Sequence, residues 1–121
     1  MFSQKGKNSV RTVSTTVRVN EFTALTADAN KGSTILNVTA NTLNANSRFG
    51  SVLAAGDLVM VIQMQGAMMN LGTYPVSWQP DSTYGYIWNY ANCGNYEFAQ
   101  VKSVISGTQI ELDCELTYSY S

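Results

Sequence analysis

The chain contains no histidine among its 121 residues, which removes the side chain that most often serves as a general base or metal ligand near neutral pH. Charged residues make up only 12% of the sequence, and the formal net charge is −1. The chain as a whole therefore shows no charge signature of nucleic-acid binding. It also lacks any run of about 18 apolar residues, so we expect no membrane insertion.

The common catalytic motifs are absent as well. The sequence has no G-x-S-x-G, no phosphate-binding loop and no dinucleotide-binding fingerprint. Glu111, Asp113 and Glu115 share one face of an expected strand, which is typical of a solvated surface, with weak calcium binding as the alternative. We therefore expect a protein that is not an enzyme, with no catalytic residues, no metal site and no cofactor.

The chain has two cysteines, Cys93 and Cys114. A structural zinc site needs four nitrogen or sulfur ligands, and a catalytic cysteine needs a histidine base, so this sequence favours neither. A disulfide and a pair of buried thiols remain as alternatives, and the low charge and β-rich composition favour the disulfide.

The residues that are present indicate an all-β fold. Ser, Thr, Asn, Gln, Gly and Tyr supply the polar surface, and no segment keeps a helical period over 11 or more residues. We expect a small barrel or a compact β-sandwich with a long aromatic-rich loop. Residues 1–9 are expected to form a flexible lead-in, and residues 10–121 a single domain.

The expected strands are short and separated by turns. They cover residues 10–19, 33–40, 57–65, 95–104 and 109–116, and Ser106-Gly107 lies in the turn of a hairpin. Between the second and third strands, residues 41–54 are expected to form a loop from which Phe49 enters the core.

Residues 57–65 carry the most apolar of these strands. Both faces are apolar through Ile62, which predicts a central strand over 58–62, paired on both sides and leaving the sheet at Gly66. Four of the five methionines follow position 59, and this cluster indicates core and rim packing rather than a copper site. Met68 and Met69 are expected at the rim, with an assembly surface as the alternative.

The last expected strand alternates strictly between apolar and polar residues. One face is predicted to enter the core and holds Ile110, Leu112, Cys114 and Leu116. Cys114 is therefore expected to face inward.

Six aromatic residues lie within the seventeen positions from 74 to 90. They are Tyr74, Trp78, Tyr84, Tyr86, Trp88 and Tyr90. On a loop interrupted by Pro and Gly, such residues can form a platform that stacks sugar rings or binds a protein partner. The alternative is that they cover one end of the barrel.

The N-terminal region is basic, because Lys5, Lys7, Arg11 and Arg18 all precede the first acid, Glu21. These cations are expected to solubilise the chain and to guard an edge strand. Contact with phosphate or with an acidic surface is the alternative.

Four segments in order carry a family resemblance. They are "GSTILNVTA", "LAAGDLVMVIQMQGA", "YG-I-NY-NCGNYEFAQVKSV" and "GTQIELDCELTYSY". Together they resemble the N-terminal β module of large secreted surface proteins of Bacteroidota-type bacteria. Those proteins are gliding-motility-associated or adhesin-like and are exported by the type IX secretion system. The resemblance runs from about Lys5 to Tyr120, and a looser form of the pattern is similar to small β modules of phage tails.

The resemblance implies a secreted, cell-surface protein whose signal peptide has been removed, and a chain that is a fragment of a longer one. It also makes Asp81-Ser82-Thr83 look like an O-glycosylation acceptor, at Ser82 or Thr83. The function it implies is a non-enzymatic structural or adhesive module that contacts other surface-protein domains or further copies of itself. The alternatives are a carbohydrate-binding module that uses the aromatics of 74–90, and a subunit of a phage-like or secreted appendage.

Overall fold

The computed structural model describes residues 12, 14–16, 18–70 and 85–121. This part of the chain forms strands and no helix, so the all-β prediction is confirmed. The strands are β1 (Ile35–Asn37), β2 (Leu58–Ile62), β3 (Met68–Met69), β4 (Ile87–Asn89), β5 (Tyr96–Ser106) and β6 (Gln109–Leu112). Among the described residues there is accordingly no helix with the length and apolarity that crossing a membrane requires.

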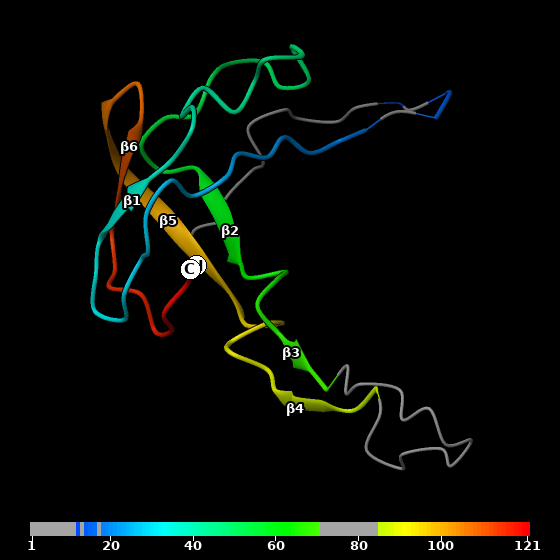
Figure 1. Ribbon diagram of the computed structural model, residues 1–121. Coiled ribbons are helices and arrows are strands. Elements are labelled where there is room, and N and C mark those ends of the chain that lie inside the picture. Colours follow the sequence, from blue (N-terminus) through cyan, green and yellow to red (C-terminus); the bar gives the residue numbers. More distant parts are fainter. Residues whose placement is uncertain (1–11, 13, 17, 71–84) are drawn as a thin grey trace, which may run out of the picture.

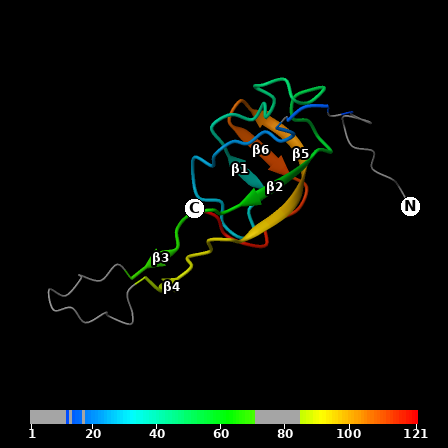
Figure 2. The same cartoon turned by 90° about the vertical axis from the view of Figure 1, so that its right-hand side faces the viewer.

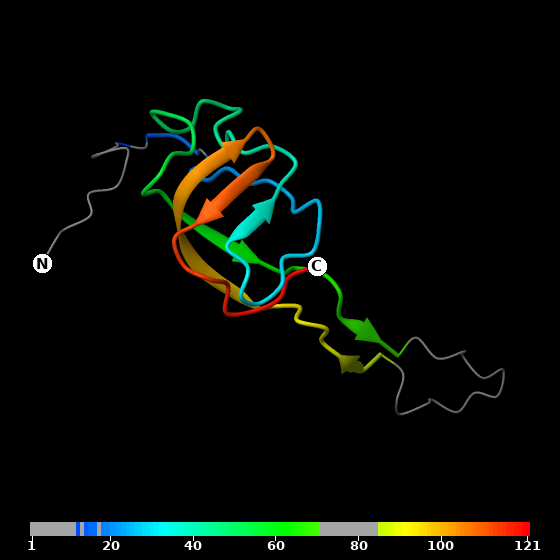
Figure 3. The ribbon, with the colours of Figure 1, turned by 90° about the vertical axis from the view of Figure 1, so that its left-hand side faces the viewer.

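Four of the strands make one antiparallel sheet in the order β1-β6-β5-β2. The sheet curls into a half-barrel around the long strand β5, which pairs with β6 on one side and β2 on the other (Figures 1 and 3). The β5–β6 pairing contains register shifts between Val101 and Ser103 and between Val104 and Ser106. Such irregularities increase strand bending and twist, which accounts for the curl.

The core lies on the concave side of this sheet. Its buried apolar side chains are Ala29, Leu36, Val38, Val61, Ala99, Val101, Ile110, Leu112, Leu116 and Tyr120. Strand β5 contributes Ala99 and Val101 and strand β6 contributes Ile110 and Leu112, as expected for paired strands that bury one face. The predicted inward positions of Ile110, Leu112 and Leu116 are confirmed.

The β1 edge of the sheet is covered by the preceding chain. Leu25 forms an isolated bridge with Val38, and the Thr26 N–H donates to the Asn37 carbonyl over 2.9 Å. Further along, Ala29 bridges Tyr120 near the C-terminus. These contacts close the half-barrel on the side away from β2.

A second, two-stranded sheet lies between β2 and β5 in the chain. It begins after the C-terminal end of β2 and returns to the N-terminal end of β5. Strand β3 pairs with β4 through Met68 opposite Asn89 and Met69 opposite Ile87. Figures 1, 2 and 3 all show this pair extending away from the curled sheet. We call the β3–β4 pair with the flanking Tyr86 and Tyr90 the arm. The described part of the expected aromatic-rich loop therefore includes the short strand β4.

Strand β2 has the predicted range but not the predicted place. It lies at the edge of the sheet, and among the described residues only β5 pairs with it. Its burial alternates, so the prediction that both faces are buried is wrong. The strand ends at Ile62, four residues before the predicted departure at Gly66.

Other predicted elements also differ. The described residues of 10–19 belong to no strand and are exposed, whereas positions 10, 11, 13 and 17 lie outside the described part, as do residues 1–9. Phe49 is half-buried and is not part of the core, so its expected entry into the core is wrong; its N–H donates to Asn44 Oδ1 within a loop. Strand β6 ends at Leu112 rather than at position 116.

Candidate functional site

The side of the β2–β5 pair that faces away from the core is apolar and open to solvent. Met60 lies opposite Phe98 and Ile62 opposite Tyr96, so their side chains share that side. The exposed fractions are 63% for Leu58, 51% for Met60, 41% for Ile62, 56% for Tyr96 and 62% for Phe98. We call these five residues the outer face. A cluster of large apolar side chains on a solvent-exposed surface is typical of an interaction site.

The two aromatic residues of the outer face hold each other in a defined geometry. The ring centroids of Tyr96 and Phe98 lie 6.2 Å apart, and the ring planes meet at 85°. An edge-to-face contact of this kind is a favoured aromatic arrangement. It presents one ring face and one ring edge to any partner that covers β5.

The arm extends the apolar surface beyond the sheet. Tyr86, Trp88 and Tyr90 occupy every second position along β4, so their side chains lie on one side of it, and all three are exposed. Met68, Met69 and Ile87 are exposed as well, and the two methionines, which were expected at the rim, lie on β3. A two-stranded hairpin is at best marginally stable alone, so the arm gains from any surface that packs against it.

Charge is almost absent from this part of the sequence. From position 58 to position 96 the only charged residue is Asp81. Charges along exposed strands normally oppose association between sheets. The outer face and the arm therefore lack the usual electrostatic barrier to contact with another apolar surface.

A buried glutamine lies where β2 gives way to the arm. Gln63 Nε2 donates to the carbonyl of Gln65 over 3.1 Å and to that of Ala91 over 3.0 Å. Its Oε1 accepts from the Ser121 N–H over 3.0 Å. Gln63 thus ties together the two strands that leave for the arm and the C-terminal residue.

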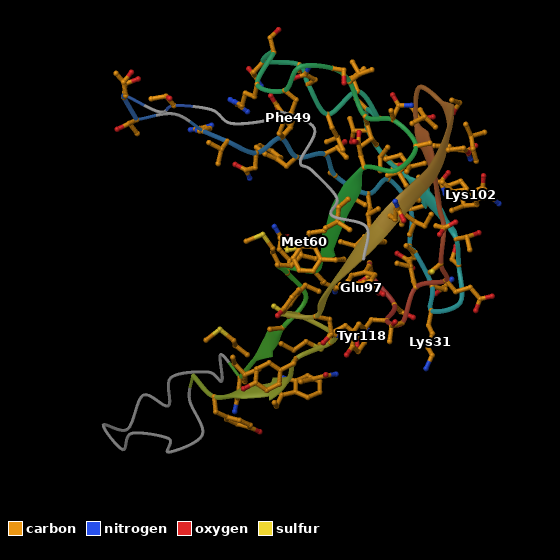
Figure 4. All side chains as sticks on the ribbon, turned by 180° about the vertical axis from the view of Figure 1, so that it is seen from behind. Lys31, Phe49, Met60, Glu97, Lys102 and Tyr118 are labelled. Carbon is orange, nitrogen blue, oxygen red and sulfur yellow. The ribbon has the colours of Figure 1, made fainter. Side chains whose placement is uncertain are left out.

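Glu97 faces the concave side and binds the C-terminal segment. Its carboxylate accepts from the N–H groups of Thr117 (2.9 Å) and Tyr118 (3.2 Å), and from the Tyr120 hydroxyl over 2.8 Å. Figure 4 shows Glu97 between β5 and the segment that carries Tyr118.

These contacts shift the titration of both groups. Partial burial acts to raise the pKa of Glu97, but the donated hydrogen bonds outweigh it, so the pKa lies below its ordinary value. Burial, and then the hydrogen bond to Glu97, raise the pKa of Tyr120. The pair is therefore a neutral phenol that donates to an ionised carboxylate, which anchors the last residues of the chain to β5.

The predicted disulfide is not present. Cys93 and Cys114 are both free thiols, and Cys114 is exposed rather than inward-facing. The strand alternation stops because the chain bends at Asp113 and Cys114 before Leu116 returns to the core.

The distance along β5 explains why the two cysteines do not meet. The Asp113 N–H donates to the Gln100 carbonyl, so Cys114 lies near the middle of β5. Cys93 lies beyond Tyr96, at the start of that strand, and its thiol donates to the Met64 carbonyl. The four-residue step from Tyr96 to Gln100 alone spans about 13 Å, whereas bridged Cα atoms lie about 4.4–6.8 Å apart.

The predicted aromatic platform is only partly described. Trp88 and its neighbours Tyr86 and Tyr90 lie together on the arm. The other predicted residues lie outside the described part of the chain, and they are Tyr74, Trp78, Ser82, Thr83 and Tyr84.

Of the acidic residues that were expected on one strand face, Glu111 lies on β6 and has local partners. Glu111 accepts from Lys102 Nζ over 2.7 Å and from Ser103 Oγ over 2.8 Å. The hydrogen bond from Lys102 lowers the pKa of Glu111. Within the described residues no three His, Cys, Asp or Glu side chains converge as metal ligands.

The sequence interpretation missed the outer face and the anchoring role of Glu97. In "NYEFAQV" the aromatics alternate with a charge and small residues, and that pattern favours placing Tyr96 and Phe98 inside. The structure has the opposite orientation, with Glu97, Ala99 and Val101 facing the concave side. The only signal for it is Tyr120, because a tyrosine hydroxyl that becomes buried needs a hydrogen-bond partner.

Comparison of the chain with known protein families, with curated proteins and with solved structures found no match.

Proposed function

We propose that this chain is a non-enzymatic structural or adhesive module of a secreted cell-surface protein or filament. Its outer face and arm bind other protein surfaces, and further copies of this chain are among them. The observation that carries the proposal is the continuous exposed apolar surface from β2 and β5 to the arm, within a stretch that holds one charged residue between positions 58 and 96. The secreted location rests on the family resemblance and on the low charge of the sequence.

The anchored C-terminus supports a module that works in series with other domains. Gln63 and Glu97 fix residues 117–121 against β2 and β5. A further domain attached after Ser121 would therefore start from a defined point next to the base of the arm. A mechanical force applied to that domain would be transmitted to β2 and β5 through these hydrogen bonds.

Sedimentation velocity over a concentration series tests this function. The wild-type chain is expected to associate, and Phe98→Ser to weaken the association at least tenfold. Ile105→Ser is the matched control, because Ile105 is equally apolar, lies on the same strand and is 51% exposed, but is not part of the outer face. Absence of association, or equal effects of both substitutions, would contradict the proposal.

A carbohydrate-binding module is the second candidate, and the row of Tyr86, Trp88 and Tyr90 favours it. Exposed aromatic rings at alternate positions offer flat apolar faces on which sugar rings can stack. Glycan-array binding that is lost in Trp88→Ala but kept in Phe98→Ser would support this candidate. If the wild-type chain binds no glycan, the candidate is excluded.

A further inference from the structure

From the open edge of β2 we infer that two copies of this chain pair through it, antiparallel, with Met60 opposite Met60 of the second copy. The inference rests on the proposed function and names the partner of the same surface. It joins two half-barrels into one continuous sheet about a twofold axis.

The hydrogen-bond pattern shows which groups remain available on β2. The Val101 N–H donates to the Asp57 carbonyl over 2.8 Å, and the Gln63 N–H donates to the Asn95 carbonyl over 3.0 Å. Odd-numbered residues of β2 therefore direct their backbone groups toward β5. The N–H and carbonyl groups of the even-numbered residues point to the open edge, where no described strand lies.

The two edge strands of the sheet differ in whether other backbone segments cover them. The β1 edge is short and is covered by residues 24–26, through the bridge to Val38 and hydrogen bonds with Asn37 and Thr39. The β2 edge pairs with β5 over five consecutive residues without a register shift. It contains no charge, no proline and no bulge, which are the features that normally prevent edge pairing. A regular, unguarded edge is what a strand-to-strand interface requires.

The sequence of β2 is complementary to itself. With Met60 on the twofold axis, Leu58 faces Ile62 of the second copy, so apolar side chains meet at every outward position. Each facing pair exchanges two backbone hydrogen bonds. The nearest charged residue, Asp57, would face neutral Gln63 of the second copy, so no like charges meet.

The outer face gives the pairing its apolar contact. Leu58, Met60 and Ile62 carry the side chains that would touch across the axis, and they lie directly beside Tyr96 and Phe98. Pairing two copies would therefore double the width of the outer face. A surface of that width is suited to stacking against another such pair.

Cross-linking through a single introduced cysteine tests the axis. In a Cys93→Ser, Cys114→Ser background, Met60→Cys is expected to form an intermolecular disulfide under mild oxidation. The Cα atoms of a hydrogen-bonded antiparallel pair lie about 5.5 Å apart, within the range that a disulfide spans. Phe98→Cys is the matched control, because Phe98 is no less exposed than Met60 but lies one strand further from the axis on each side. Equal cross-linking of the two variants would overturn the inference.

The register has its own test. Leu58→Cys alone should cross-link poorly, whereas an equimolar mixture of Leu58→Cys and Ile62→Cys should cross-link as well as Met60→Cys. If Leu58→Cys cross-links efficiently with itself, the twofold axis is not at Met60.

A charge exchange at the axis separates this inference from the proposed function. Met60→Asp and Met60→Lys should each give a monomer, and mixing them should restore a dimer, since opposite charges then face each other. If neither substitution changes association while Phe98→Ser still abolishes it, the proposed function stands and the β2 pairing is wrong. If the wild-type chain remains a monomer throughout, both are wrong.

Discussion

Both sides of the β2–β5 pair carry apolar side chains, but one side is buried and the other is exposed to solvent. On the concave side, Val61 is 6% exposed and packs with Ala99 and Val101 in the core. On the other side, Met60 and Phe98 pair across the same two strands and are more than half exposed. Hydrophobicity alone therefore does not decide which side of this ribbon is the core. The rest of the chain decides, because β1, β6 and the C-terminal segment cover only one side.

Of the substitutions that compare the two sides, Val61→Asp should lower the free energy of unfolding the most. Val61 lies opposite Glu97, so Val61→Asp would bury a second carboxylate beside the first one. An uncompensated buried charge costs about 3–5 kcal/mol, a large part of the stability of a small domain. We expect Val61→Asp to be unfolded or nearly so in a chemical denaturation experiment.

Met60→Asp is the matched control for Val61→Asp, one residue away on the other side. Because Met60 is exposed, the unfolding free energy of the monomer should change by about 1 kcal/mol or less. If Met60→Asp destabilises the monomer as strongly as Val61→Asp, the outer face is part of the core and the comparison fails.

The link between the sheet and the arm depends on Gly66. Its φ is +111°, a conformation that L side chains rarely adopt, and an added Cβ would lie 3.1 Å from Gln63 Nε2. Gly66→Ala should cost about 2 kcal/mol of unfolding free energy, since it combines backbone strain with a disturbed Gln63 network. Gly107→Ala should change the unfolding free energy little, because nothing lies within 4 Å of its added Cβ and its φ is not positive. Equal effects would mean that the Gly66 turn relaxes without strain.

The anchoring of the C-terminus by Glu97 should make stability depend on pH. The pKa of Glu97 is lower in the folded chain than its ordinary value of 4.5, so its contribution is present above that value. The contribution is lost as the pH falls through the folded pKa. Glu97→Gln should lower the unfolding free energy by about 1.5 kcal/mol at pH 7, because the charge-assisted hydrogen bonds are lost.

The difference between wild type and Glu97→Gln should shrink on going from pH 7 to strongly acidic pH. Glu115→Gln controls for the removal of an acid, since Glu115 is exposed in the same C-terminal region. A stability difference that is independent of pH would show that Glu97 acts through packing rather than through its charge.

Local patterns predicted much of the fold. The alternation from Gln109 to Leu112 predicted the correct inward residues, and the β5–β6 hairpin reverses at Gly107-Thr108, one residue later than the expected Ser106-Gly107. The range of β2 was also correct, because its run of β-branched and aliphatic residues is bounded by Gly56 and Gln63. Each of these features depends only on residues close in sequence.

What could not be predicted depends on contacts between distant segments. The edge position of β2 follows from the strand order, and no local pattern in 58–62 encodes that order. The inward orientation of Glu97 requires Tyr120, 23 residues further along the chain. Cys114 was expected in the core because its alternation with Leu112 and Leu116 was extended through a bend that local sequence did not mark.

The smallest expected effect on stability concerns the arm. Met68 and Met69 are 46% and 50% exposed, so Met68→Ser and Met69→Ser should each change the unfolding free energy of the monomer by about 0.5 kcal/mol or less. Leu116→Ser is the buried control and should cost several times more, because Leu116 is 2% exposed in the core. Association is the sharper measurement, since the methionine side chains belong to the surface that is proposed to bind. If both serine variants keep the stability of the monomer and lose its self-association, the arm belongs to the interface together with the outer face. If they associate as the wild type does, the contact is confined to the β2–β5 pair and the arm serves another partner.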